Sequence, residues 1–109
     1  MDNQRLQKLL SLYDSNNPDD FLLFALAKEY ENMGELEEAL VYYKKLKDHN
    51  PEYVGFYYHL AHLYQEFEDW TNAVRTYEAG IDMATKLGDT HALSELKNAK
   101  LNMELEQGL

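Results

Sequence analysis

The chain has 109 residues, no cysteine and a net charge of −10, and its length is that of one domain. The absence of cysteine excludes disulfide bonds and thiolate chemistry. With 20 acidic against 10 basic side chains, the charge argues against a nucleic-acid or anionic membrane partner, because like charges repel. No stretch is apolar enough to cross a bilayer, and the first residues lack a signal-peptide pattern. We therefore expect a cytoplasmic protein.

The first predicted element is a helix from Asp2 to about Tyr13 that carries leucines along one side. The segment Asn17-Pro18-Asp19-Asp20 follows it. We expect Asn17 to cap the next helix, with a proline in the first turn and two acids at the positive helix end.

Two amphipathic helices come next, separated by a short turn at Gly34. The first has apolar residues at the spacing i, i+3, i+4 and i+7, which is one face of a helix. Gly34 can adopt the left-handed conformation that ends a helix. The apolar faces consist of Leu23, Leu26, Ala27 and Tyr30, and then of Leu36, Ala39, Leu40, Tyr43 and Leu46.

A second pair of helices repeats this arrangement. Asn50-Pro51-Glu52 resembles the earlier capping segment and predicts another helix start. Asp69 is expected to cap the second helix of the pair, which begins at Trp70. The apolar faces consist of Tyr57, Leu60, Ala61 and Tyr64, and then of Trp70, Ala73, Val74 and Tyr77.

The last predicted element is a helix from about Thr90 to Glu106. Gly88-Asp89 marks the end of one helix and the start of the next. The inner face of this last helix is mixed, because Lys100 lies in a stripe of leucine, alanine and methionine. A mixed face is expected of a terminal element with one solvated side, so we interpret this helix as a cap.

The two helix pairs are copies at a period of 34 residues, seen when residues 20–53 are aligned with residues 54–87. Close antiparallel packing needs small side chains where two backbones approach, and alanine recurs in those places. One hairpin cannot bury its own faces, so the copies are expected to stack. The identical pairs are Leu26/Leu60, Ala27/Ala61, Tyr30/Tyr64, Ala39/Ala73, Tyr43/Tyr77 and Asp48/Asp82.

This pattern resembles the tetratricopeptide repeat, whose period is 34 residues and whose motif is W-x2-L-G-x2-Y…A-x3-F…P. The first copy reads Leu23-x2-Leu26-Ala27-x2-Tyr30, then Ala39-x3-Tyr43 and Pro51, and the second reads Tyr57-x2-Leu60-Ala61-x2-Tyr64, then Ala73-x3-Tyr77. The second copy departs from the motif at Gly80 and Thr85, so its second helix is expected to run on to about Leu87.

The resemblance implies an all-α fold, a right-handed solenoid of antiparallel helix hairpins with about six helices. We expect one domain over residues 1–109. It would consist of a flanking helix in 1–16, repeats in 18–52 and 53–87, and a capping helix in 89–107.

The resemblance also implies a protein–protein interaction scaffold, in which first helices line a concave groove that holds a peptide or a partner helix. An alternative reading is that the groove rings pack on the N-terminal helix or on a second copy. A homo-oligomer could also form through exposed aromatics among Phe56, Tyr57, Phe67 and Trp70. The implied groove residues are Phe21, Phe24, Lys28, Glu31, Asn32, Tyr58, His62 and Gln65.

Metal binding and catalysis are weak alternatives. His59, His62 and Glu66 lie on one side of a helix, but a closed metal site needs further ligands. The chain shows no phosphate loop, no nucleophile motif and no spacing that builds a pocket around an acid. We therefore expect no enzyme activity, no cofactor and no metal.

Overall fold

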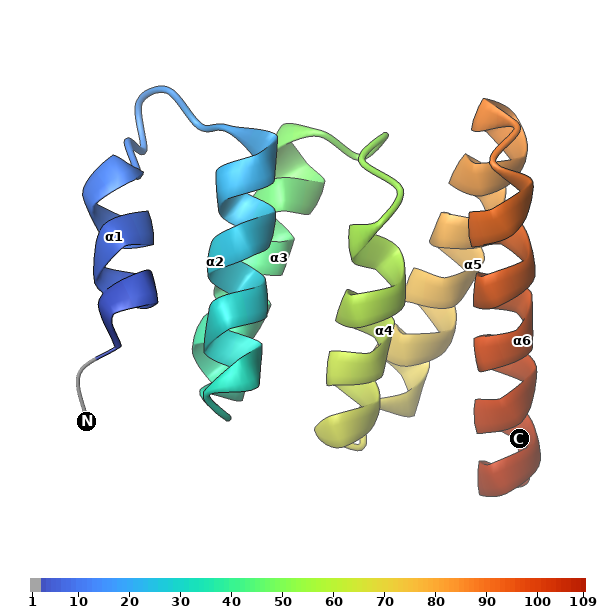
Figure 1. The fold of residues 1–109 in the computed structure, drawn as a ribbon. Helices are drawn as coiled ribbons and strands as arrows, with labels where there is room; N and C mark the ends of the chain where they lie inside the picture. Colours follow the sequence, from blue (N-terminus) through green and yellow to red (C-terminus); the bar gives the residue numbers. More distant parts are fainter. Residues whose placement is uncertain (1–2) are drawn as a thin grey trace. The chain divides into compact units, whose positions relative to one another are not determined.

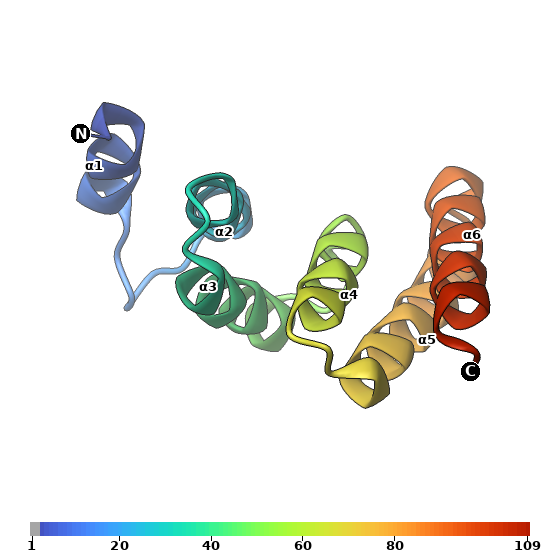
Figure 2. The same cartoon turned by 90° about the horizontal axis from the view of Figure 1, so that it is seen from below.

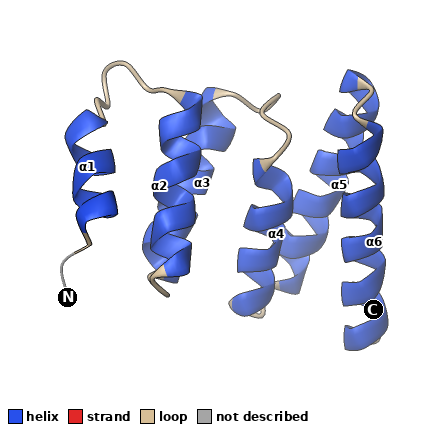
Figure 3. Ribbon diagram, viewed as in Figure 1, coloured by secondary structure: helices blue, strands red, loops and turns tan. Residues whose placement is uncertain are grey.

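Helices account for nearly all the regular structure of this chain. The computed structural model describes residues 3–109, and within that range it contains six helices and no strand (Figure 3). The chain divides into two units, Met1–Tyr53 and Val54–Leu109. The predicted all-α class with about six helices is confirmed.

The first unit holds α1 (Gln4–Leu12), α2 (Asp20–Asn32) and α3 (Leu36–His49). Figures 1 and 2 both show α3 running back beside α2 as an antiparallel hairpin, with α1 on another side of α2. The side chain of Asn3 caps α1 by accepting a hydrogen bond from the Leu6 N–H. The predicted start of this helix at Asp2 lies outside the described residues.

Ring stacking holds the linker after α1 to the hairpin. The Tyr42 ring stacks on Tyr30, with centroids 5.6 Å apart, and meets the edge of Tyr13 at 5.7 Å. Offset and edge-to-face ring pairs of this kind stabilise a fold beyond the area that they bury. Tyr13, the first residue after α1, is thereby held against α3.

The second unit holds α4 (Phe56–Glu66), α5 (Trp70–Leu87) and α6 (Thr90–Gln107). In Figure 1, α5 runs back beside α4, and α6 packs along α5 and also contacts α4. The prediction that α5 continues to Leu87 is confirmed. Gly80 allows this packing, because a Cβ at that position would lie 2.7 Å from the Tyr57 Cβ and 3.0 Å from Leu96.

The alanines expected at the helix contacts are all inaccessible to solvent. In each hairpin the predicted alanine of the first helix and that of the second are buried, and a buried tyrosine from the second helix fills the space beside them. All of them have 0% exposure, and they are Ala27, Ala39 and Tyr43 in the first unit and Ala61, Ala73 and Tyr77 in the second. The packing role predicted for them is confirmed.

The two hairpin turns have the same backbone geometry but different residues at the critical position. Gly34 has φ +78° and Glu68, which occupies the matching position in the second hairpin, has φ +57°. Both turns close with the same pair of backbone hydrogen bonds to the preceding helix, including Glu35 N–H to Tyr30 C=O and Asp69 N–H to Tyr64 C=O, each 2.9 Å. Left-handed φ is unfavourable for glutamate, so the second turn carries strain that the first avoids.

Of the four predicted N-terminal helix caps, two are confirmed and two are wrong. Asp69 and Asp89 cap α5 and α6 as expected. The cap of α2 is Asp19 rather than Asn17, because Asp19 accepts the Leu22 N–H and the helix starts only at Asp20. Asn50 does not start a helix.

Asn50 instead ends α3 and holds its hairpin closed. Its side-chain oxygen accepts the Glu52 N–H in a turn, and α4 begins six residues later. Its amide nitrogen donates to the Asp20 carboxylate at 2.6 Å, which ties the end of α3 to the start of α2. The His49 imidazole adds a 3.2 Å contact to the same carboxylate.

We predict that Glu68→Gly stabilises the protein. Glycine relieves the left-handed strain but gains more freedom in the unfolded chain, so the net gain should be about 0.5–1 kcal/mol in the free energy of unfolding. Urea unfolding followed by circular dichroism measures it. The matched variant Gly34→Glu should shift stability in the opposite direction. Equal stability of both variants and the parent protein would contradict the strain argument.

We predict that Gly80→Ala destabilises the protein. Alanine is a better helix former than glycine by about 1 kcal/mol, but overpacking against Tyr57 costs about 1–3 kcal/mol. The net effect should be a lower Tm in thermal unfolding. Gly55→Ala adds the same methyl group at an exposed position with φ −64° and should leave Tm nearly unchanged. A rise in Tm for Gly80→Ala would contradict the overpacking argument, because it would mean that α5 can move away from Tyr57 at little cost.

Candidate functional site

Three of the five predicted binding residues on α2 differ in how far a partner could reach them. Phe24 is half-buried, with its ring centroid 6.2 Å from that of Tyr43 and 5.5 Å from that of Tyr53. Lys28 lies 3.9 Å from the Glu31 carboxylate. Asn32, in the last turn of α2, is exposed. Phe24 is therefore partly a core residue, whereas Asn32 is open to solvent.

Each hairpin ties a buried tyrosine hydroxyl to the facing helix at the same repeat position. Tyr43 of α3 donates to the Glu31 carboxylate at 2.7 Å, and Tyr77 of α5 donates to the Gln65 side-chain carbonyl. A buried hydroxyl without a partner would cost free energy, so both acceptors stabilise their hairpins. Glu31 and Gln65, predicted as binding residues, thus also have a structural role.

Burial controls the chemistry of these two tyrosines. It raises the pKa of the Tyr43 hydroxyl, and the hydrogen bond to Glu31 and the Glu31 charge raise it further. Burial likewise raises the pKa of Tyr77, with a smaller effect from Tyr58. A phenol that holds its proton this firmly is a poor acid near neutral pH, which favours packing over catalysis.

The predicted residues on α4 form a ring pair. The half-buried Tyr58 ring lies 5.0 Å from the exposed His62 imidazole, with the planes tilted by 32°, and meets the edge of His59 at 5.6 Å. His62 is one turn along from Tyr58, just as Lys28 is one turn along from Phe24. Each first helix therefore presents a half-buried ring followed by a nitrogen-bearing side chain.

Two of the four aromatics considered for self-association are not available for it. Phe56 is 0% exposed and Tyr57 is 2% exposed, so neither can belong to an exposed patch. They point inward because α4 begins at Phe56 and its first turn packs in the core of the second unit. Phe67 is 40% exposed, and Trp70 is half-buried.

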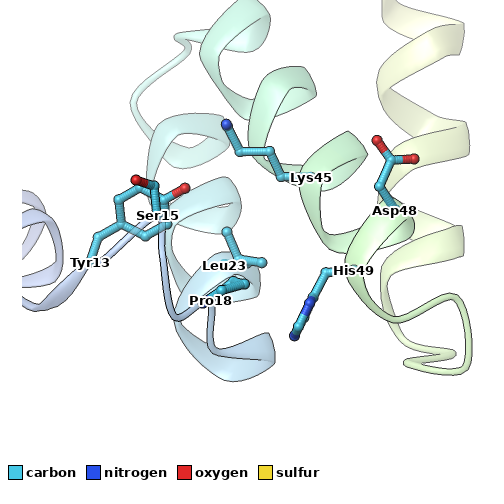
Figure 4. A pocket seen from close by; sticks show the side chains of 7 residues that line it. All are labelled: Tyr13, Ser15, Pro18, Leu23, Lys45, Asp48 and His49. Carbon is cyan, nitrogen blue, oxygen red and sulfur yellow. The ribbon is translucent and has the colours of Figure 1, made fainter.

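The first unit also contains a depression of about 310 Å³ that sequence reasoning missed (Figure 4). Figure 4 shows the linker after α1 and the end of α3 facing each other across Leu23. The wall combines a cation with an acid and an imidazole, so it favours no single charge in a ligand. Its lining residues are Tyr13, Ser15, Pro18, Leu23, Lys45, Asp48 and His49.

Within residues 3–109, no group of three or more histidine or carboxylate side chains is placed to hold a metal ion. His59, His62 and Glu66, considered for such a site, are not joined there by further ligands. Over the same residues, no helix combines the length and the apolar character that a membrane span requires.

Family models match both helix pairs. Two models of the tetratricopeptide repeat match residues 22–53 and residues 57–91. The first match covers α2 and α3, and the second covers α4, α5 and the start of α6. The chain matches no curated protein.

Solved structures agree with the family models. The crystal structure of a tetratricopeptide repeat domain protein from Salinibacter ruber is 39% identical, with a TM-score of 0.76 over 80% of this chain and 97% of that one. A solution structure of such a domain from the same organism is 40% identical, with a TM-score of 0.76 over 79% of this chain and 87% of that one. A protein from Bordetella parapertussis, 23% identical, shares the fold with a TM-score of 0.82 over 97% of this chain and 91% of that one.

We predict that the protein loses stability above about pH 10. The unfolded chain releases phenolic protons near that pH, whereas the raised pKa values of Tyr43 and Tyr77 keep their protons in the folded state. Each such tyrosine lowers the free energy of unfolding by up to about 1.4 kcal/mol per pH unit above that point, and by nothing well below it. Urea unfolding at a series of pH values measures this slope.

The double variant Tyr43→Phe/Tyr77→Phe should lose stability less steeply as the pH rises, because it lacks both of these titratable hydroxyl groups. Phenolate absorbance checks the same point in the parent protein. If all nine tyrosines ionise while circular dichroism still reports a folded chain, the argument from burial is wrong.

Proposed function

Because this chain belongs to the tetratricopeptide repeat family, we propose that it binds a peptide or a helix of a partner protein through the first helices of its repeats, α2 and α4. Repeats of this family generally mediate protein–protein interactions and are typically non-catalytic scaffolds. The proposal treats residues 18–52 and 53–87 as the two repeats. It assigns the chain no catalysis and no cofactor.

The observation that carries the proposal is the pairing of a ring with a polar side chain at the same place in both repeats. Phe24 and Lys28 on α2 correspond to Tyr58 and His62 on α4. The rings are half-buried and so are held in place, which lowers the entropic cost of using them as contacts. The polar groups beside them can hydrogen bond to a peptide backbone or side chain.

The partner that fits this surface has an apolar side chain next to hydrogen-bonding groups. The apolar side chain would lie against Phe24 or Tyr58, and the polar groups would meet Asn32, Lys28 or His62. Phe21, Glu31 and Gln65 complete the proposed set. The proposal places this binding in the cytoplasm, the compartment expected from the sequence.

We predict that Asn32→Ala and His62→Ala weaken binding of the partner without unfolding the protein. Both side chains are exposed, so Tm should stay the same, while loss of central polar contacts should reduce affinity by about tenfold. The partner would first be isolated by affinity capture with cross-linking, and then purified and titrated by calorimetry.

Lys44→Ala on α3 and Asp82→Ala on α5 are the matched controls, because both side chains are exposed on second helices. These two variants should bind the partner as the parent protein does. If the control variants lose affinity while Asn32→Ala and His62→Ala keep it, the second helices form the binding surface and the proposal is wrong.

A further inference from the structure

An apolar groove lies in the first unit between the last turn of α1 and the first turn of α2. Its volume is about 560 Å³. Figure 1 shows the linker crossing between these two helix ends, so the end of α1 and the start of α2 lie at the same end of the unit. The groove is lined by Leu9, Leu12, Asp14, Asn17, Asp19, Phe21 and Leu22.

The apolar walls of this groove are unusually exposed. Phe21 is 71% exposed and Leu12 is 60% exposed, although both belong to residue types that are normally buried. Covering such side chains is worth about 25 cal/mol for each Å² of apolar surface removed from water. A rimmed apolar hollow of this kind is typical of an interaction site.

The way α1 is attached explains why the groove stays open. The start of α1 is fixed to the middle of α2, since Asn3 and Arg5 each reach a different oxygen of the Glu29 carboxylate at 3.1 Å. Leu6 is buried beside them. These contacts hold the first turn of α1, whereas Leu9 is only half-buried and Leu12 is exposed. The apolar face of α1 is thus packed against the protein at the start of the helix and exposed at the end of the helix.

The charge around the groove selects the kind of occupant. The charged side chains that line it are Asp14 and Asp19, both acidic. Each uses one oxygen to accept a backbone N–H, of Asn16 and Leu22 respectively, both at 2.9 Å. Within residues 3–109 the second oxygen of each makes no hydrogen bond to the protein. Two positioned carboxylates therefore face solvent at the groove.

Nearby cations do not cancel this negative charge. Arg5 is paired with Glu29 at the far end of α1, and Lys8 lies one turn before Leu12 but does not line the groove. The partial positive charge at the start of α2 is opposed by Asp19 and Asp20. The net charge of the whole chain is −10. Charge complementarity thus points to a basic occupant.

We propose that this groove binds a basic segment of a partner protein, which inserts an apolar side chain between Leu12 and Phe21 and sets lysine or arginine against Asp14 and Asp19. This site shares only Phe21 with the surface proposed on α2 and α4. It does not depend on that surface, because its lining comes from α1, the linker and the first turn of α2.

A labelled synthetic peptide tests the proposal. The probe carries a Leu-Phe pair flanked on both sides by lysines, and its binding is followed by fluorescence anisotropy at low salt. One matched peptide replaces the lysines with glutamates, and another replaces the Leu-Phe pair with alanines. We expect saturable binding of the first peptide and at least about tenfold weaker binding of the other two.

Asp14→Asn/Asp19→Asn tests the carboxylates. Asparagine caps a helix about as well as aspartate, so the fold should persist while two charges are lost. Affinity should fall by about three- to tenfold, and the difference should shrink as salt is added. Glu37→Gln/Glu38→Gln on the first turn of α3 removes the same number of exposed charges elsewhere and should bind the probe as the parent does.

Leu12→Ser/Phe21→Ser tests the apolar walls and should weaken binding by at least about tenfold with little change in Tm. Val41→Ser, at a 44% exposed position of α3, is its control. Asn32→Ala and His62→Ala should bind the probe normally, which separates this groove from the surface on α2 and α4.

Three results would overturn the proposal. The first is no saturable binding of the basic peptide. The second is binding that survives in both groove variants. The third is self-association in sedimentation experiments that Leu12→Ser/Phe21→Ser abolishes, because a second copy of the chain would then occupy the groove.

Discussion

The close approach of paired helices is the constraint on which the rest of this structure depends. Ala27 meets the α2–α3 contact from one side and Ala39 from the other, and both are fully buried. Ala61 and Ala73 do the same between α4 and α5. Helix separation is set by the side chains at the contact, so a larger residue at these places would push the backbones apart.

The short helix separation brings the second-helix tyrosines within reach of the first helices. Tyr43 and Tyr77 can each donate to a side chain on the facing helix only because the hairpins are tight. Glu31 and Gln65 consequently serve the hairpins, and the half-buried Phe24 and Tyr58 remain at their surfaces. Packed and exposed positions thus alternate along the same helices, so a repeat can keep its core while its surface varies.

Some of the acidic side chains that give the chain its negative charge also cap helices. Asp19, Asp69 and Asp89 each cap a helix with one side-chain oxygen. At the start of α2 this capping acid lies beside the exposed Phe21. One residue therefore contributes to helix stability and to the charge of a surface hollow. The negative charge of the chain is in this way partly a structural requirement.

The sequence alone determined the helices, their pairing and the buried alanines and tyrosines. These features are encoded locally or by a fixed period, and the physical causes are helical spacing, side-chain size and short-range capping. Asp69, Gly88 and Asp89 end or begin helices as predicted, because their capping bonds join residues a few positions apart. The choice of α2 and α4 as candidate binding helices came from the family resemblance.

Only the tertiary structure decided the features that depend on distant residues. Asn50 ends a helix instead of starting one because its amide binds Asp20, thirty residues earlier in the chain. Glu68 is left-handed because the second hairpin must close with the same turn as the first, whatever residue stands there. Phe21 is exposed whereas Phe56 is buried because neighbouring helices cover one and not the other. The exposure of a side chain depends on which distant segments pack against it, and a local sequence pattern does not contain that information.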